Sequence, residues 1–382
     1  MKPDNTIIIH STRSSRQRGL SLIELMVSIT IGLLILVSLS SMFINQSRAR
    51  AELDKSNRMI DNGRYSLELL SESLQLAGFY GAFGPTGSSA ARFNACNIPR
   101  ILSATSNLNI LLLHTEGFDA ATPASQIAGL PCGFTYAANS SLSLKTGSDI
   151  IVIRRLETTS VTQAAAPNDG SIYMQVSSCQ YDTTPYRIST DPATLTLGQR
   201  NITGVDNCIR VAGINTIAAP FADLRKLKTE MYFIASNNNP GDGIPTLKRL
   251  ELTNNGAGAP TFSPTPLVEG IEYMQVEYGV DDPLLDTDGI GGAGLDGVPD
   301  SYTSCSACTL EQWSNVVSVK FHLIARNIDE TKGHKDTTTY SLGTAGVAGA
   351  AGTVGPFNDS YKRHAFTQLV RLTNPSGRRE LP

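Results

Sequence analysis

The feature that most constrains this chain is an uninterrupted apolar run from Leu20 to Ile44. The run is 25 residues long, holds no Lys, Arg, Asp or Pro, and has Glu24 as its only charged residue. A helix of that length measures about 37 Å at about 1.5 Å per residue, which is enough to cross a hydrocarbon core of about 30 Å. The sequence therefore predicts a transmembrane helix over residues 20–44.

The residues on either side of the run predict its orientation. The short segment before it carries four basic residues against one acid, and two arginines follow it. Because the denser basic flank usually stays in the cytoplasm, we expect a cytoplasmic N-terminus. A secretory signal peptide is the alternative, but its apolar region would span only about 7 to 15 residues and would end at a small-residue cleavage site. Here the small residue, Gly19, precedes the apolar run.

The order of features at the N-terminus resembles the class III signal of type IV prepilins. A basic leader ends in Gly19, Leu20 follows, and a glutamate occupies the fifth position after the glycine, at the start of the apolar run. In that family a membrane peptidase cuts after the glycine and methylates the new amine. The resemblance implies that a prepilin peptidase cuts between Gly19 and Leu20, where Leu20 replaces the more frequent phenylalanine. The mature protein would then begin at Leu20.

This cleavage would explain the carboxylate at Glu24. It creates a positive amine at Leu20 inside the apolar layer, and a neighbouring subunit, staggered along a helical bundle, can offer its own Glu24 to that amine. Because an unpaired charge in a low dielectric is costly, such a pair would set the stagger of assembly more than it adds stability. The alternative is a Glu24 that snorkels to the membrane interface.

Helical periodicity continues beyond the apolar run. Apolar residues still recur at spacings of three, four and seven up to Ala77. Gly63 interrupts this pattern at a cost of about 1 kcal/mol, and Gly78 is placed to end the helix. We therefore expect a leader over residues 1–19, one long helix over residues 20–78, and a head over residues 79–382 under which the second half of the helix packs.

The head has the sequence pattern of a β-rich domain. Strand-like runs alternate with Gly, Ser, Asn and Pro clusters. The strongest predicted strands cover residues 149–157, 230–236, 245–252, 270–280, 313–326 and 364–372. Residues 343–355 are almost wholly Gly, Ala, Val and Thr, which predicts a mobile loop. The predicted fold class is α+β, with a long N-terminal helix packed on a β-rich head.

The order of these blocks resembles the PilW family of type IV pilus minor pilins. The similar blocks are GSDIIVIR, YFIAS followed by PTLKRLEL, VEGIEYMQVEYGVD, an Asp-rich loop closed by DGVPDSY, and WSNVVSVKFHLIAR. The resemblance implies a type IV pilin-like fold and a minor subunit that joins other minor pilins in a complex which primes pilus assembly. It places this subunit at or near the pilus tip, with the major pilin and a PilY-type tip adhesin among its partners. The J-type pseudopilin of type II secretion has a similar layout and is the alternative.

The resemblance also implies a location. The protein would cross the inner membrane once, with its head in the periplasm, and would reach the pilus tip or cell surface after assembly. Without the leader the chain has 27 basic and 33 acidic residues, a net charge of −6. The sequence shows no cluster of basic residues of the kind that binds nucleic acid, so we expect no nucleic-acid partner.

Six cysteines follow the apolar run, in the oxidising compartment where we place the head. Many connectivities are possible, and sequential pairing is the simplest, since each pair closes a local loop. The predicted pairs are Cys96 with Cys132, Cys179 with Cys208, and Cys305 with Cys308.

The Asp-rich segment from 281 to 300 is the candidate metal site. Calcium binds several oxygen ligands from loops of this kind. The tentative ligands are Asp286, Asp288, Asp296 and Asp300. An EF-hand loop that began at Asp286 would need Asp or Asn at its fifth position, where Ile290 stands, and a GIGGAGL insertion separates the two halves of the segment. A solvated acidic turn is the alternative.

An enzyme is the remaining class of hypothesis. The sequence contains no G-x-S-x-G, HExxH or P-loop motif, and its five histidines are scattered. Cys305 and Cys308 form a CxxC, but no βαβ pattern surrounds it, so we interpret it as a structural disulfide. We therefore expect no catalytic residues, and a membrane-anchored enzyme is the least favoured alternative.

Overall fold

A computed structural model describes the chain at Gly19 and over residues 21–92, 94–104, 107–118, 132–137, 140–179, 182–198, 221–284, 294–343 and 352–380. The chain divides into two compact units, Met1–Asp54 and Lys55–Pro382. A long N-terminal helix and a β-rich head are both present, which confirms the predicted fold class.

Helix α1 (Leu22–Gln75) contributes residues to both units. Its start and end agree with the predicted helix to within three residues, and Gly78 follows it with a φ of +69°, the left-handed conformation in which glycine commonly ends helices. Among the described residues, α1 is the one helix that is long and apolar enough to cross a membrane. The large apolar side chains of its first half are all exposed, with exposed fractions of 49–77%.

The second half of α1 belongs to the core of the head. Met59, Leu67, Leu70 and Leu74 are buried, and they join a hydrophobic cluster that draws on both sheets of the head. This confirms that the second half of the helix packs against the head. Gly63 lies so close to β13 that an added Cβ would stand 2.2 Å from Cε2 of Phe366. From the sequence, Gly63 was expected only to weaken the helix. The close approach of Phe366 is the reason that a glycine is needed at this position.

In the part of the chain that the structure describes, the larger sheet has seven antiparallel strands. They are β1 (Thr115–Phe118), β2 (Ile150–Leu156), β3 (Tyr173–Val176), β4 (Tyr186–Ser189), β5 (Leu224–Ala235), β6 (Thr246–Asn254) and β7 (Pro260–Glu269). The order along the sheet is β1-β2-β5-β3-β4, and β6 pairs with both β5 and β7. Strands β2, β5 and β6 were predicted, although β5 begins six residues before its predicted start.

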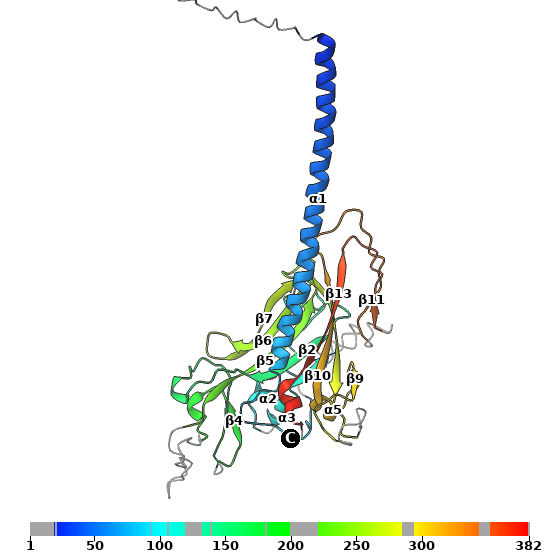
Figure 1. Ribbon diagram of the computed structural model, residues 1–382. Helices are drawn as coiled ribbons and strands as arrows, with labels where there is room; N and C mark the ends of the chain where they lie inside the picture. The colour runs from blue at the N-terminus through cyan, green and yellow to red at the C-terminus, as the bar shows by residue number, and fades with distance from the viewer. Residues whose placement is uncertain are drawn as a thin grey trace, which may run out of the picture. The chain divides into compact units, whose positions relative to one another are not determined.

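The smaller sheet has four antiparallel strands in the order β13-β10-β8-β9. They are β8 (Ile271–Val280), β9 (Ser301–Thr303), β10 (Val316–Arg326) and β13 (Arg363–Arg371). Figure 1 shows the turns of α1 after Lys55 flanked by strands of both sheets, which agrees with the shared hydrophobic cluster. The core of the head therefore lies where α1 meets the two sheets.

One local prediction was wrong, and another can be compared with the structure only in part. Trp313 was assigned to a strand, but it lies in the short helix α5 (Leu310–Ser314), which starts at a reciprocal hydrogen-bonded cap between Thr309 and Gln312. The indole is buried against the ring of Tyr278, with 4.8 Å between centroids. Most of the predicted loop over 343–355 lies outside the described residues. Near its end, β12 (Thr353–Val354) pairs with β11 (Tyr340–Ser341).

Three further short helices of the head lie within the described residues. They are α2 (Ile98–Leu102), α3 (Asn107–Leu112) and α6 (Thr373–Gly377), with 3-10 turns η1 (Gln163–Ala165) and η2 (Pro192–Thr194). Helix α6 packs near the end of α1, where Asn374 Nδ2 donates to the carbonyl of Ala77 at 3.2 Å and Arg378 Nη1 donates to that of Gly78 at 3.0 Å. The last carbonyls after a helix lack partners within it, so the C-terminal segment supplies them here.

Candidate functional site

The predicted processing site lies directly before α1. Gly19 is exposed, with nothing within 4 Å of the position that a Cβ would take. Leu20, the predicted new N-terminus, lies outside the described residues. An accessible glycine in irregular backbone fits a peptidase substrate, but cleavage between Gly19 and Leu20 stays a prediction.

Glu24 lies in the first turn of α1, and its Oε2 accepts a hydrogen bond from the backbone N–H of Ser21 at 3.0 Å. The first N–H groups of a helix have no partner within it, and a carboxylate near this positive end of the helix dipole is favourable. Ser21 and Glu24 have the S-x-x-E spacing of a capping box. This local role was not predicted, although the spacing of three residues between Ser21 and Glu24 indicates it.

The consequence is that Glu24 has two candidate functions. Its carboxylate stabilises the start of α1 within its own chain, and it stands at the end of the helix where cleavage would create the amine. A glutamine would keep the first function and lose the charge that the second one needs. The two functions can therefore be separated by substitution.

The Asp-rich segment is only partly described. Asp286 and Asp288 lie outside the described residues, and the described part of the chain holds no cluster of three or more potential metal ligands. Asp296 Oδ1 accepts from the N–H of Val298 at 2.8 Å, and Asp300 Oδ2 accepts from the N–H of Asp282 at 2.7 Å. Both carboxylates thus order turns of their own segment, and calcium binding stays a prediction.

A neighbouring aspartate ties this segment to the C-terminus. Asp281 is buried, and its Oδ2 accepts from the N–H of Gly297 at 2.9 Å and from Arg379 Nη1 at 3.3 Å. Burial is the largest influence on the pKa of Asp281 and raises it, against the lowering effect of these two donors. The same burial lowers the pKa of Arg379. The pair joins the loop before β9 to the C-terminal segment.

The cysteines of the head that the structure describes are oxidised. Disulfides join Cys96 to Cys132 and Cys305 to Cys308, as in the sequential pairing. Cys179 is also disulfide-bonded, but its predicted partner Cys208 lies outside the described residues. The CxxC is thus a local link between the end of β9 and the start of α5.

The buried histidines of the head have structural contacts. His114 is hydrogen-bonded through Nε2 to the carbonyl of Val316 at 2.8 Å, and burial lowers its pKa to about 3. His322 lies between Glu277 (Nε2 to Oε2, 3.3 Å) and Thr367 (Nδ1 to Oγ1, 3.0 Å), and burial lowers its pKa as well. These contacts join the residue directly before β1 to β10, and join β10 to β8 and β13. Both imidazoles are therefore neutral links between strands at neutral pH.

Buried ion pairs are a feature that the sequence did not predict. Arg363 lies among the carboxylates of Glu272 (2.6 Å), Asp336 (2.9 Å) and Asp359 (2.6 Å). Burial opposes the charge of Arg363, but these carboxylates outweigh it and raise the pKa of the guanidinium above its usual value. Glu272 and Asp336 are so far from Arg363 in sequence that nothing indicated their contact.

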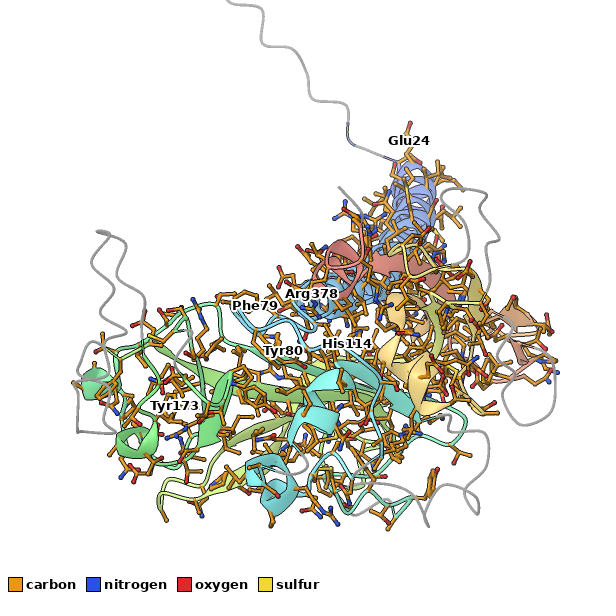
Figure 2. The ribbon with its side chains drawn as sticks, turned by 90° about the horizontal axis from the view of Figure 1, so that it is seen from below. Glu24, Phe79, Tyr80, His114, Tyr173 and Arg378 are labelled. Atoms are coloured by element: carbon orange, nitrogen blue, oxygen red, sulfur yellow. A yellow bond between two sulfur atoms is a disulfide. The ribbon has the colours of Figure 1, made fainter. Side chains whose placement is uncertain are left out.

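Two hollows on the head are large enough to hold part of a partner. One of about 530 Å³ is lined by His114, Glu311, Pro375 and Arg378, near the end of α1. Figure 2 shows Arg378 close to Phe79 and Tyr80, while Tyr173 lies well away in the larger sheet. The other, of about 550 Å³, borders β4 at the edge of that sheet. Hollows of this size on the surface of the head can accept part of a partner protein.

Two family models match this chain. The model of type IV pilus-assembly protein W matches residues 231–374, and the model of the prokaryotic N-terminal methylation motif matches residues 14–40. The resemblance to the PilW family is confirmed. The PilW match runs from within β5 into α6 and includes the whole of the four-stranded sheet. Comparison with curated proteins and with solved structures gave no match.

The methylation motif and the long apolar helix fit a membrane-anchored, pilin-like protein. The PilW family is one of pilus-assembly proteins, a structural class. Strands β1 to β4 and helices α2 and α3 lie outside both matches. The surface near β4 is therefore built by a part of the head for which the family gives no expectation.

Proposed function

We propose that this protein is a minor pilin of a type IV pilus, which joins other minor pilins in a complex that primes assembly at or near the tip. The observation that carries the proposal is the combination of two matches in one chain. A prepilin methylation motif leads directly into α1, and a PilW match follows in the head. Other minor pilins, the major pilin and a PilY-type tip adhesin are the proposed partners.

The first half of α1 supports this proposal because it lacks a partner of its own within the described chain. Its large apolar side chains are all exposed, from Leu22 at 77% to Leu25 and Ile44 at 49%. So much apolar surface is costly in water and favourable in lipid or in a bundle of similar helices. We propose that lipid of the inner membrane covers it before assembly, with the head in the periplasm, and that neighbouring subunits cover it afterwards.

Processing is the first test. Gly19→Val should leave a full-length precursor in the membrane, whereas the wild-type protein should have its N-terminus at Leu20. Gly32→Val is the matched control, since Gly32, within α1, also has nothing within 4 Å of its Cβ position. Intact mass and N-terminal sequencing give the readout. A mature N-terminus anywhere other than Leu20 would contradict the prepilin assignment.

Assembly is the second test, and Glu24 is the residue that separates capping from pairing. Glu24→Ala removes the cap and the charge, Glu24→Gln keeps a cap without the charge, and Glu24→Asp keeps the charge on a shorter arm. If the carboxylate pairs with the Leu20 amine of a neighbour, Ala and Gln should both abolish most surface fibres while the protein stays cleaved and membrane-held. Asp should be intermediate.

The readout is the number of surface fibres in strains with matched levels of this protein. Normal fibre numbers with Glu24→Gln, together with a loss in Glu24→Ala, would show that only the cap matters. Wild-type numbers in Glu24→Ala would exclude both functions. Intact fibres together with lost protein secretion would instead support the J-type pseudopilin alternative.

A further inference from the structure

Within the described residues, the seven-stranded sheet ends at β4, which pairs with β3 along one side. The N–H of Ser177 donates to the carbonyl of Pro185. In an antiparallel pair of strands, hydrogen-bonded and non-hydrogen-bonded residue pairs alternate, so Gln175 and Arg187 form the next hydrogen-bonded pair. Tyr186 and Ile188 therefore turn their backbone N–H and C=O groups away from β3. Within the described residues, no hydrogen bond occupies these outward groups.

A groove borders this open edge, between β4 and helices α2 and α3. It measures about 550 Å³, and Leu102, Leu108, Pro185 and Ile188 line it with apolar surface. Leu108 is 40% exposed on the rim. Figure 1 shows α2 beside the sheet near β4, at the margin of the head.

The wall of the groove is held in place. The hydroxyl of Tyr186 donates to Asn107 Oδ1 at 2.8 Å, and its ring packs on Phe83 with 4.5 Å between centroids. Both Tyr186 and Ile188 pack against the core cluster that contains Ile101 and Leu111. The edge therefore presents fixed backbone groups and needs little ordering to accept a strand.

Arg187 lies between Tyr186 and Ile188 in β4, so its side chain points to the opposite face of the strand from theirs. Among the described residues that line the groove, it is the only charged one. Its guanidinium makes long contacts with neutral acceptors, the carbonyl of Thr194 at 3.5 Å and Oγ1 of Thr196 at 3.4 Å. In the described part of the chain it has no carboxylate partner. A cation in this position favours an acidic residue on the strand that would lie beside it.

We propose that this groove binds an extended segment of a partner protein as an additional strand along β4. Successive side chains of a strand point to opposite faces, so every second residue of the segment would be apolar and face Leu102 and Leu108. The residue between them would be acidic and face Arg187. The outward N–H and C=O groups of Tyr186 and Ile188 would supply the backbone hydrogen bonds.

In the described part of the chain, the other edges of this sheet are less open to such a strand. Strand β7 carries Pro260, Pro264 and Pro266, and prolines cannot donate to a neighbouring strand. At β1 the carbonyl of Gly117 already accepts from Arg92. Protected edges are the rule in native sheets, so an open edge beside an apolar groove indicates a partner strand.

Binding can be measured on the full-length protein in detergent, without reference to pilus assembly. The probe is a blocked, fluorescently labelled peptide of seven residues, with Val at odd positions, Glu at the centre and Thr at the other two. We expect saturable binding by fluorescence anisotropy. N-methylation of alternate peptide nitrogens should weaken it about tenfold or more, because the backbone hydrogen bonds are lost.

Two variants test the groove and the cation separately. Leu108→Asp should weaken binding about tenfold or more, since it places a charge beside the apolar side chains of the probe. Arg187→Ala should abolish the preference for the Glu peptide over the same peptide with central Lys. Leu369→Asp is the matched control, because Leu369 is also exposed, at 56%, but lies on β13.

Several results would overturn the proposal. They are no saturable binding to the wild-type protein, equal affinity for the N-methylated peptide, or equal weakening by Leu369→Asp. A concentration-dependent dimer of the chain that Leu108→Asp dissociates, with no binding of the peptide, would assign the edge to a second copy instead. The failure of these tests would leave the cleavage and fibre tests unaffected.

Discussion

The two halves of α1 have the same backbone and opposite surfaces. From Leu22 to Ile44 the large apolar side chains are exposed, whereas from Met59 to Leu74 one stripe is buried in the head. The first half is apolar all round, and the second is apolar only on the face that the sheets cover. A helix that is apolar all round needs surroundings that are apolar all round, which a single small head does not provide. The comparison indicates that only the second half is completed by its own chain.

The largest expected difference in stability between the two halves of α1 is for leucine-to-alanine substitutions. Leu70 is fully buried in the core cluster and Leu34 is 71% exposed. Leu70→Ala should lower the free energy of unfolding of the head by about 2–5 kcal/mol, because it removes packing and leaves a cavity. Leu34→Ala should leave that unfolding unchanged.

Denaturant unfolding of the full-length protein in detergent, followed by the fluorescence of Trp313, measures both variants. Trp313 is the only tryptophan and is buried against Tyr278, so it reports on the head. An equal loss of stability in Leu34→Ala would mean that the first half also belongs to the cooperative unit.

A smaller difference is expected at serine. Ser73 Oγ donates to Glu230 Oε2 at 2.5 Å within the head, whereas Ser28 Oγ donates to the backbone carbonyl of Glu24 at 2.7 Å within the helix. A hydrogen bond to a charged group contributes about 1.5–3 kcal/mol, and a buried acceptor that loses its donor is costly. Ser73→Ala should therefore destabilise the head by about that amount, and Ser28→Ala should not. The same unfolding measurement tests this prediction. An unchanged free energy of unfolding in Ser73→Ala would show that Arg155 and Arg249 satisfy the carboxylate of Glu230 without Ser73.

The smallest difference is expected at glycine, where two effects oppose each other. An alanine at either position gains about 1 kcal/mol of helix propensity. At Gly63 the new Cβ would overlap the ring of Phe366, and overpacking of this kind costs about 1–3 kcal/mol. Gly63→Ala should therefore destabilise the head by about 1 kcal/mol. Gly32→Ala should leave the unfolding of the head unchanged, since Gly32 has nothing within 4 Å.

Replacing the ring of Phe366 by a smaller side chain tests whether overlap with that ring causes the loss of stability. In a Phe366→Leu background the penalty of Gly63→Ala should shrink or change sign, because the atoms that the new Cβ would meet belong to that ring. An unchanged penalty in the double variant would show that the close approach to β13 is not the cause.

Local patterns predicted a large share of the fold. The periodicity of apolar residues gave the extent of α1, and strand-like runs located β2, β5, β6, β8, β10 and β13. The prepilin motif around Gly19 and the glutamate at 24 are also local, so a family model matches the same segment. The S-x-x-E cap at Ser21 was within reach of the same reasoning, since its signal is a spacing of three.

The tertiary structure decided what depends on residues distant in sequence. Trp313 lies in a helix because a cap at Thr309 and the ring of Tyr278 outweigh its strand propensity. The need for glycine at 63 arises from Phe366, and the carboxylates around Arg363 come from three separate segments.

The groove at β4 is the clearest case of this division. It joins Leu102 and Leu108 of one segment to residues 185–188 of another, and neither segment carries a motif. By itself, the sequence determined the processing signal, the apolar helix and the main strands, because each depends on the spacing of neighbouring residues. Only the fold decided which helix face is buried, which strand edge has no neighbour among the described strands and what lies beside it, because those follow from contacts that sequence spacing does not encode.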